Sequence, residues 1–190
     1  MRKVIVSTYA TLDGFVDNPH LWSLRHWCDE AAAYARDLLF GCDALLFGRV
    51  TYQGFAQAWP TMTDEGGFAD RMNALRKYVV STTLRSGGWG ETTVLADDVV
   101  GRIAELKAQP GQHILSYGSG RLAGTLLAHH LVDEYHIWVH PVVIGSGRPL
   151  FPRGATATLD LRAVRQFPTG VVALTYRPVA EPAESAARSS

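Results

Sequence analysis

The segment HILSYGSGRLAGTLL (residues 113–127) is the part of the chain around which the predicted fold is arranged. It predicts a short apolar strand, a glycine turn and a helix whose first turn carries Arg121. Glycine lets the chain turn tightly and lets another group approach the backbone closely. A helix start presents unpaired N–H groups and a partial positive charge. The segment therefore suits a phosphate or pyrophosphate, although glycine and serine are equally ordinary residues in a simple connection.

The composition is typical of one globular domain. Of the 190 residues, 47% are hydrophobic, and 18 basic residues balance 18 acidic ones, so no charged surface favours nucleic acid or an anionic membrane. Cys28 and Cys42 lie too far apart for a Cys-x-x-Cys pattern, which argues against a disulfide framework or structural zinc. No apolar run approaches the roughly 20 residues of a membrane span, and a polar residue follows the N-terminus too soon for a signal peptide. We expect a soluble, cytoplasmic protein.

Predicted strands alternate with predicted helices along the chain. The strands are expected at residues 3–10, 44–47, 77–81, 92–95, 113–117, 134–144, 159–167 and 171–176. The helices are expected at residues 29–40, from 97 or 98 to 108, and 121–130, with Asp29 as a plausible N-cap of the first. This alternation predicts a central, mainly parallel eight-stranded sheet with helices on both faces, closed by a C-terminal antiparallel hairpin.

Chemically useful groups follow four of these strands. The turns after Ala10, Gly48, Ser81 and Tyr117 all lie at carboxyl ends of expected parallel strands, where ligands of such sheets bind. Gly118-Ser119-Gly120 offers backbone donors, Arg49 and Thr51 lie at a second helix start, and Ser81-Thr82 supplies hydroxyls. Because arginine binds phosphate with a bidentate fork, the combination suits a ligand with several phosphate groups, such as NADPH.

Several of these segments resemble a known family. Gly48-Arg49-Val50-Thr51 is similar to the Gly-Arg-x-Thr signature of the dihydrofolate reductase-like superfamily. The whole chain resembles the reductase domain of the bifunctional riboflavin-biosynthesis deaminase/reductase and its stand-alone relatives. The matching segments, in the family's order, are residues 11–14, 48–52, 77–81, 117–120, 131–134 and 141–147.

The resemblance implies NADPH as cofactor and hydride transfer to a small pterin-like or pyrimidine-like heterocycle. It places Arg49 and Ser81 at the adenosine 2′-phosphate, Thr51 with Gly118, Ser119 and Gly120 at the pyrophosphate, and Tyr9, Ala10 and Val16 by the nicotinamide. Tyr117 and Leu122 would line the cofactor, and Gly48, Thr82 and Arg121 complete the expected set. It also implies a reductase domain over residues 1–178 and a possible homodimer. The composition after this domain, mainly Ala, Glu, Ser and Pro, predicts a disordered tail over residues 179–190.

Simpler roles stay open for two of these residues, and the chain departs from its relatives at a third position. Arg49 could be a solvated charge at a helix end, and Ser81 a strand-end hydroxyl. Thr82 replaces an arginine that relatives usually carry, which leaves Arg49 as the main candidate for selecting the 2′-phosphate.

The proton donor is not assigned. Asp29 or Glu30 lies where a folate reductase carries its carboxylate, but the residue type of Asp29 favours a helix cap. No catalytic residue is therefore predicted, and the sequence argues against folate reduction. The aromatic residues that could stack on a planar substrate, or fill the core instead, are Trp22, His26, Trp27, Tyr52, Phe55 and Trp59.

Other functions fit less well. His136 and His140 would lie about 13 Å apart on one strand, too far to share a metal ion. The chain lacks the Gly-x-Ser-x-Gly turn of hydrolases. The glycine loop comes too late in the chain for a two-half dinucleotide fold. A nucleotide-binding module of the same fold without efficient turnover remains the alternative.

Overall fold

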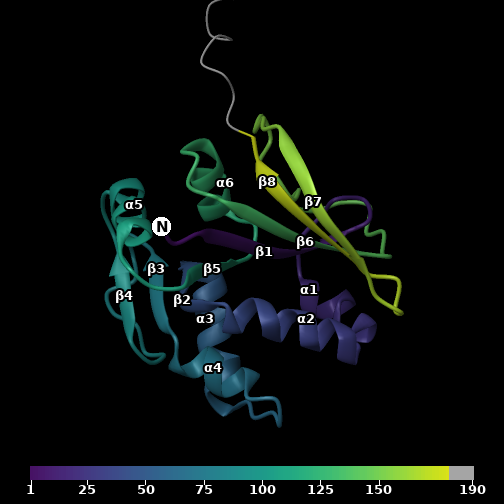
Figure 1. Cartoon of the computed structure of the whole chain (residues 1–190), viewed down its shortest axis with the longest axis horizontal. Helices are drawn as coiled ribbons and strands as arrows, with labels where there is room; N and C mark the ends of the chain where they lie inside the picture. Colours follow the sequence, from purple (N-terminus) through teal and green to yellow (C-terminus); the bar gives the residue numbers. More distant parts are fainter. Residues whose placement is uncertain (180–190) are drawn as a thin grey trace, which may run out of the picture.

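A computed structural model describes residues 1–179, which build one eight-stranded sheet in the order β4-β3-β2-β5-β1-β6-β8-β7 (Figure 1). The strands are β1 (Val4–Thr11), β2 (Cys42–Gly48), β3 (Arg76–Val80), β4 (Thr92–Leu95), β5 (His113–Tyr117), β6 (Glu134–His140), β7 (Leu159–Gln166) and β8 (Val172–Pro178). Strands β1 to β6 all run parallel to one another, whereas β8 pairs antiparallel with both β6 and β7. The predicted mainly parallel sheet with a closing hairpin is confirmed. The expected tail at 179–190 lies, from residue 180, outside the described residues.

Helices cover both faces of this sheet. They are α1 (Pro19–Trp22), α2 (Asp29–Phe40), α3 (Arg49–Ala58), α4 (Phe68–Ala74), α5 (Val99–Ala108) and α6 (Arg121–Ala128), with 3₁₀ turns η1 (Leu24–His26) and η2 (Trp59–Thr61). Val4 and Leu46 pack with α5 and α6 on one face. Ile5 and Leu45 point to the other face and pack with α2, α3 and α4 (Figure 1). Because both faces are buried, the central strands are apolar throughout instead of alternating.

Three predicted details are wrong at element ends. The strand expected at 134–144 ends at His140, since Pro141 has no N–H for the ladder. Cys28, not Asp29, is the N-cap of α2; Asp29 lies in the first turn, where its charge still interacts favourably with the helix dipole. Helix α6 ends at Ala128 instead of residue 130, and His130 has a positive φ of 53°.

The segment 59–74, for which the sequence predicted no helix or strand, contains η2 and α4.

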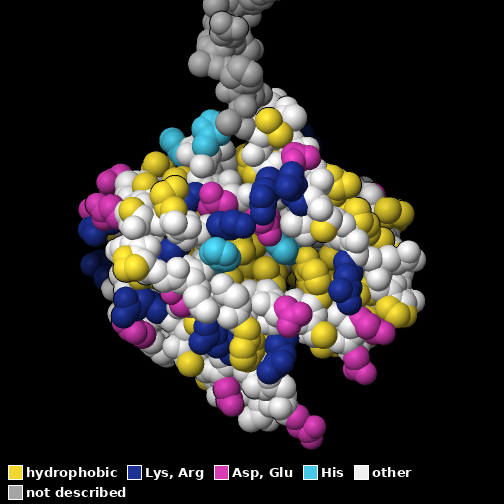
Figure 2. Space-filling model, viewed as in Figure 1, with side chains coloured by type: hydrophobic (Ala, Val, Ile, Leu, Met, Phe, Trp, Pro, Cys, Tyr) yellow, Lys and Arg dark blue, Asp and Glu magenta, His cyan; other side chains and the backbone are white. Residues whose placement is uncertain are grey.

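The surface matches the balanced composition. Figure 2 shows basic and acidic side chains interspersed over the face in view. In the part of the chain that the structure describes, no helix is both long enough and apolar enough to cross a membrane.

Candidate functional site

A cleft of about 1580 Å³ opens at the carboxyl ends of the central strands and extends between α2, α3 and α6. The expected cofactor residues that line it are Tyr9, Val16, Gly48, Arg49, Thr51, Ser81, Thr82, Tyr117, Gly118, Ser119, Gly120, Arg121 and Leu122. Ala10 is the exception, because its side chain is 2% exposed and packs inside the hydrophobic core. The strand topology therefore gathers nearly all of these residues in one place, and their roles there stay predictions.

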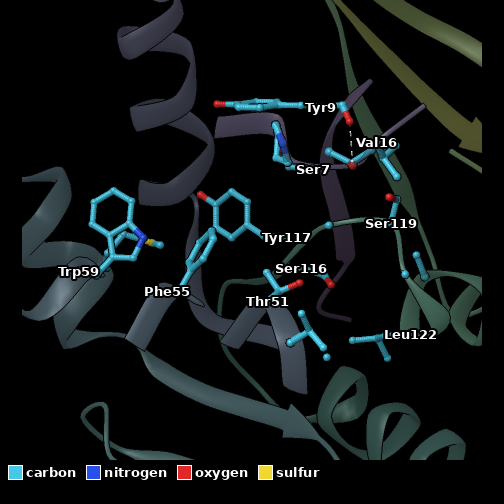
Figure 3. Close-up of a pocket in the computed structure, with 18 of the residues that line it drawn as sticks. Ser7, Tyr9, Val16, Thr51, Phe55, Trp59, Ser116, Tyr117, Ser119 and Leu122 are labelled. Carbon is cyan, nitrogen blue, oxygen red and sulfur yellow. Dashed lines mark hydrogen bonds between the residues drawn. The ribbon is translucent and has the colours of Figure 1, made fainter. Parts of the chain in front are cut away.

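Two helix starts meet at one end of this cleft. Gly48 and Gly120 are the N-caps of α3 and α6, and neither helix has a side-chain cap for its first N–H groups. Gly118 adopts a φ of +95° and donates its N–H to the Ser7 carbonyl over 3.1 Å. A Cβ at position 118 would lie 3.2 Å from Thr51 Oγ1. The glycine turn thus lies directly against the start of α3 (Figure 3). The free N–H groups at the starts of α3 and α6 therefore lie at the same end of the cleft.

Arginine side chains surround this end. Arg49 is exposed and donates to Gln53 Oε1 over 3.0 Å. Arg121 lies in the first turn of α6 and also lines the cleft. Arg148, which the sequence reasoning missed, lies beside Gly120 and forms an ion pair with Asp17 over 3.3 Å. Together with the two helix dipoles, these cations make this end favourable for an anion.

Ser81 and Thr82 follow β3 beside Arg49. The register pairs Gly48 with Val80, so the residues after them lie at neighbouring strand ends. The Ser81 hydroxyl oxygen accepts the N–H of Thr83 over 3.2 Å and that of Leu84 over 2.9 Å. The Ser81 hydroxyl therefore stabilises the turn that follows β3, which agrees with the simpler role of a strand-end hydroxyl. Ser81 also lines the cleft.

The loop after β1 holds Arg148 and Val16 in place. Asp13 accepts the Thr11 hydroxyl over 2.6 Å and the Gly145 N–H over 2.8 Å, and these hydrogen bonds, that from Thr11 foremost, lower the pKa of its carboxyl. Val16 in turn donates its N–H to the Arg148 carbonyl over 3.0 Å. The segments 11–16 and 141–150 thus form one edge of the cleft although they are far apart in sequence.

Two tyrosines line the middle of the cleft. Tyr9 comes from β1 and Tyr117 from β5, and their rings extend from the strands toward the same side of the cleft (Figure 3). Burial raises the pKa of Tyr9 to about 12 and raises that of Tyr117 as well. Both hydroxyls therefore stay protonated at neutral pH and can donate a hydrogen bond.

The aromatic residues singled out for stacking divide into two groups. Trp27, Phe55 and Trp59 line the cleft. Trp22, His26 and Tyr52 do not; Trp22 is buried and Tyr52 uses its hydroxyl to accept the Trp89 N–H over 3.1 Å. Trp22 and Tyr52 therefore fill the core, which was the alternative role expected for these aromatic residues.

The candidate proton donors lie elsewhere. Asp29 and Glu30 are exposed and do not line the cleft. Among the described residues, Asp64 is the carboxylate that lines it. Asp64 accepts the N–H groups of Ala69 and Phe68 at the start of α4, and these bonds lower its pKa. It acts as an ionised helix cap, so the geometry assigns no acid to the site.

Relatives of the chain are known from sequence. The family described as the RibD C-terminal domain matches residues 2–173. The uncharacterized Bacillus subtilis protein YyaP is 31% identical over 182 residues, which cover 92% of this chain and 94% of YyaP.

Three solved structures share the architecture. A pyrimidine reductase-like protein from Corynebacterium diphtheriae matches with a TM-score of 0.71 at 14% identity, over 95% of this chain and 93% of that one. The Thermotoga maritima diaminohydroxyphosphoribosylaminopyrimidine deaminase/5-amino-6-(5-phosphoribosylamino)uracil reductase matches with a TM-score of 0.63 at 18% identity, over 94% of this chain and 57% of that longer one. Dihydrofolate reductase from Enterococcus faecalis, complexed with NADP(H), matches with a TM-score of 0.62 at 11% identity, over 93% and 96%.

These low identities establish the fold alone, and it is the expected dihydrofolate reductase-like fold. Membership rests on the sequence match, which spans most of the described residues. The resemblance noted in the sequence is confirmed: the chain belongs to the RibD C-terminal domain family.

Proposed function

We propose that the chain is an NADPH-dependent reductase that transfers a hydride to a small pterin-like or pyrimidine-like heterocycle. The observation that carries this proposal is the meeting of the α3 and α6 N-termini at one end of the cleft. Family membership supports it, since solved structures of the same fold are described as reductases, one of them complexed with NADP(H).

The residues at this end fit a dinucleotide. Gly118 leaves open the space beside Thr51 that a Cβ would occupy, so a pyrophosphate can approach the free N–H groups of both helices. Arg121 and Arg148 would balance its charge. Arg49, with the Ser81-Thr82 turn, would hold a 2′-phosphate. When bound, the reduced nicotinamide supplies the hydride.

The nicotinamide would lie toward Tyr9 and Val16, which line the cleft beyond the glycine turn. Because the Ala10 side chain is buried, Ala10 would contribute there only through its backbone. The protein's part in the reaction is to orient the two ligands and exclude water from between them.

A second function, nucleotide binding without efficient turnover, is favoured by one observation. The carboxylate found at the cleft, Asp64, already caps α4. Oxidation of NADPH with any member of a panel of pterins and pyrimidines would exclude this second function, and binding without oxidation would support it.

The first test is a fluorescence titration with NADPH and NADH on the wild type and on Arg49→Ala. Loss of a charge-assisted contact to the 2′-phosphate should weaken NADPH binding about tenfold, which corresponds to about 1.4 kcal/mol, and leave NADH binding unchanged. Arg102→Ala, an exposed arginine on α5 outside the cleft, is the matched control. No binding at about 1 mM NADPH would contradict the reductase proposal, and equal effects on both nucleotides would contradict the role of Arg49.

A further inference from the structure

The cleft is larger than one ligand requires. Its volume of about 1580 Å³ exceeds the roughly 300–1,000 Å³ of typical single-ligand pockets. Thr51, Phe55 and Trp59 all line it, and their four-residue spacing puts them along one side of α3 and the turn that follows. Eight residues of helix span about 12 Å. The cleft therefore continues from the helix starts toward a second region near the end of α3 (Figure 3).

This second region, here called the aromatic end, is lined mainly by apolar side chains, together with Arg36 and Asp64. Its defining lining residues are Ala32, Ala35, Phe55, Trp59 and Phe68. The two alanines belong to α2 and leave room that larger side chains would fill. Trp59 packs on Phe55 and Phe68, with ring centroids 6.1 and 5.4 Å apart. The aromatic end therefore combines packed aromatic rings with small alanine side chains along the cleft, a lining that suits a planar ring.

The charges near the aromatic end do not favour an anion. Arg36 lines it, but its Nε donates to the Gly66 carbonyl over 2.9 Å and its guanidinium lies 4.7 Å from the Phe40 ring centre. Asp64 carries the opposite charge close by. The C-terminus of α3 lies at this end, and its dipole is negative there. Phosphate is thus favoured at the start of α3 and disfavoured at its end.

Two hydrogen-bond donors lie between the two regions. The hydroxyls of Tyr9 and Tyr117 line the cleft, and neither has a hydrogen-bond partner among residues 1–179. Tyr117 packs against Phe55 with a centroid distance of 5.4 Å, so its hydroxyl borders the aromatic end. A carbonyl oxygen placed here would satisfy donors that the protein leaves unpaired.

We propose that the aromatic end binds an uncharged, planar substrate that carries a carbonyl group, with Tyr9 and Tyr117 donating to that oxygen. This inference rests on the proposed reductase function. It separates the chain from the Thermotoga maritima enzyme, whose name specifies a phosphoribosyl substrate.

The test uses a matched pair of planar probes, ethyl coumarin-3-carboxylate and the coumarin-3-carboxylate anion. Binding is followed by quenching of tryptophan fluorescence and by the rise in melting temperature, without turnover. The neutral ester should bind about tenfold more tightly than the anion. Trp59→Ala should weaken ester binding by a similar factor, since it removes one wall of the aromatic end, and leave NADPH binding unchanged. Tyr117→Phe should weaken the ester about fivefold or more through the lost hydrogen bond.

Each opposite result overturns the proposal. If the anion binds as tightly as the ester, the proposal is refuted. If Arg36→Ala then abolishes binding of the anion, Arg36 is the residue that binds it. Failure of the ester to bind at about 1 mM would also refute the proposal. The NADPH titration reports separately on the other end of the cleft. Ester binding without NADPH binding would refute the proposed function and leave the aromatic end intact; the reverse would refute only this inference.

Discussion

Lys77 is a buried cation that has no carboxylate partner within residues 1–179, and its replacement should change how stability depends on pH. Its side chain is fully buried in β3, and Nζ donates to the Asn73 carbonyl and lies 4.4 Å from the Trp89 ring centre. Burial lowers the pKa of this lysine from 10.5 to about 8. The charged amine is therefore less favourable in the folded chain than in the unfolded one.

The sign and size of the effect follow from this shift. Below pH 8 both states hold the proton, and the folded state carries the full cost of the buried charge. Between pH 8 and 10.5 the folded lysine has lost its proton while the unfolded one retains it, so the free energy of unfolding rises with pH. The difference between the pKa of 10.5 in the unfolded chain and of about 8 in the folded one corresponds to about 3 kcal/mol over this range.

Lys77→Met isolates this contribution, since methionine fills a similar volume without charge. Burial raises the pKa of Cys42 to about 12, which lowers wild-type stability above pH 9, so the two proteins must be compared at each pH. The free energy of unfolding, from urea titrations followed by tryptophan fluorescence, should rise in the wild type relative to the variant by about 3 kcal/mol between pH 7 and 10.5.

A paired lysine is the matched control. Lys107 is also buried, but its Nζ lies 2.6 Å from Asp133 Oδ2 and donates to the Leu131 carbonyl over 2.9 Å. Lys107→Met should destabilise the protein by about 2 kcal/mol at pH 7, because it removes the cation beside the partly buried Asp133 and the donor to the Leu131 carbonyl. If the difference between wild type and Lys77→Met stays constant from pH 7 to 10.5, the reasoning about Lys77 is refuted.

Three further variants test the cleft and the surface. Gly118→Ala should lower the free energy of unfolding by about 1–2 kcal/mol through its positive φ, and weaken NADPH binding by pressing on Thr51; unchanged urea and NADPH titrations would contradict both effects. Asp13→Asn should speed hydrogen exchange of the Gly145 amide, because that N–H loses a charged acceptor, and unaltered exchange would show that the two loops hold together without it. We propose that the exposed apolar face of the closing hairpin forms a homodimer, so Val164→Asp, at a side chain 58% exposed, should convert a dimer to a monomer in light scattering; a monomeric wild type would refute this.

Sequence alone was sufficient to locate the cleft. Four turns after apolar strands, at Ala10, Gly48, Ser81 and Tyr117, were expected at one edge because the carboxyl ends of parallel strands meet there. The structure places them there. This was predictable because strand periodicity and glycine turns are local properties, and the rules for crossover connections then leave few arrangements.

Arg148 and Asp64 could not be predicted as cleft residues. Arg148 reaches the cleft through hydrogen bonds between loops 131 positions apart in sequence, such as that from its N–H to Asp17. Asp64 precedes a short helix whose pattern is too brief to recognise. Contacts of this kind depend on how two loops pack, and no local period reports them.

The division of the aromatic residues was likewise decided by tertiary packing. Tyr52 and Phe55 lie one turn apart on α3 and are similar in size. Tyr52 packs beneath Trp89, where its hydroxyl is used, whereas Phe55 and Trp59 border the open cleft. Sequence by itself indicated a helix start after Gly48 and marked Tyr52, Phe55 and Trp59 as aromatic residues that either stack on a ligand or fill the core. Which of them is core and which is binding surface depends on where β2 and α2 lie against the helix, and only the assembled structure determines that.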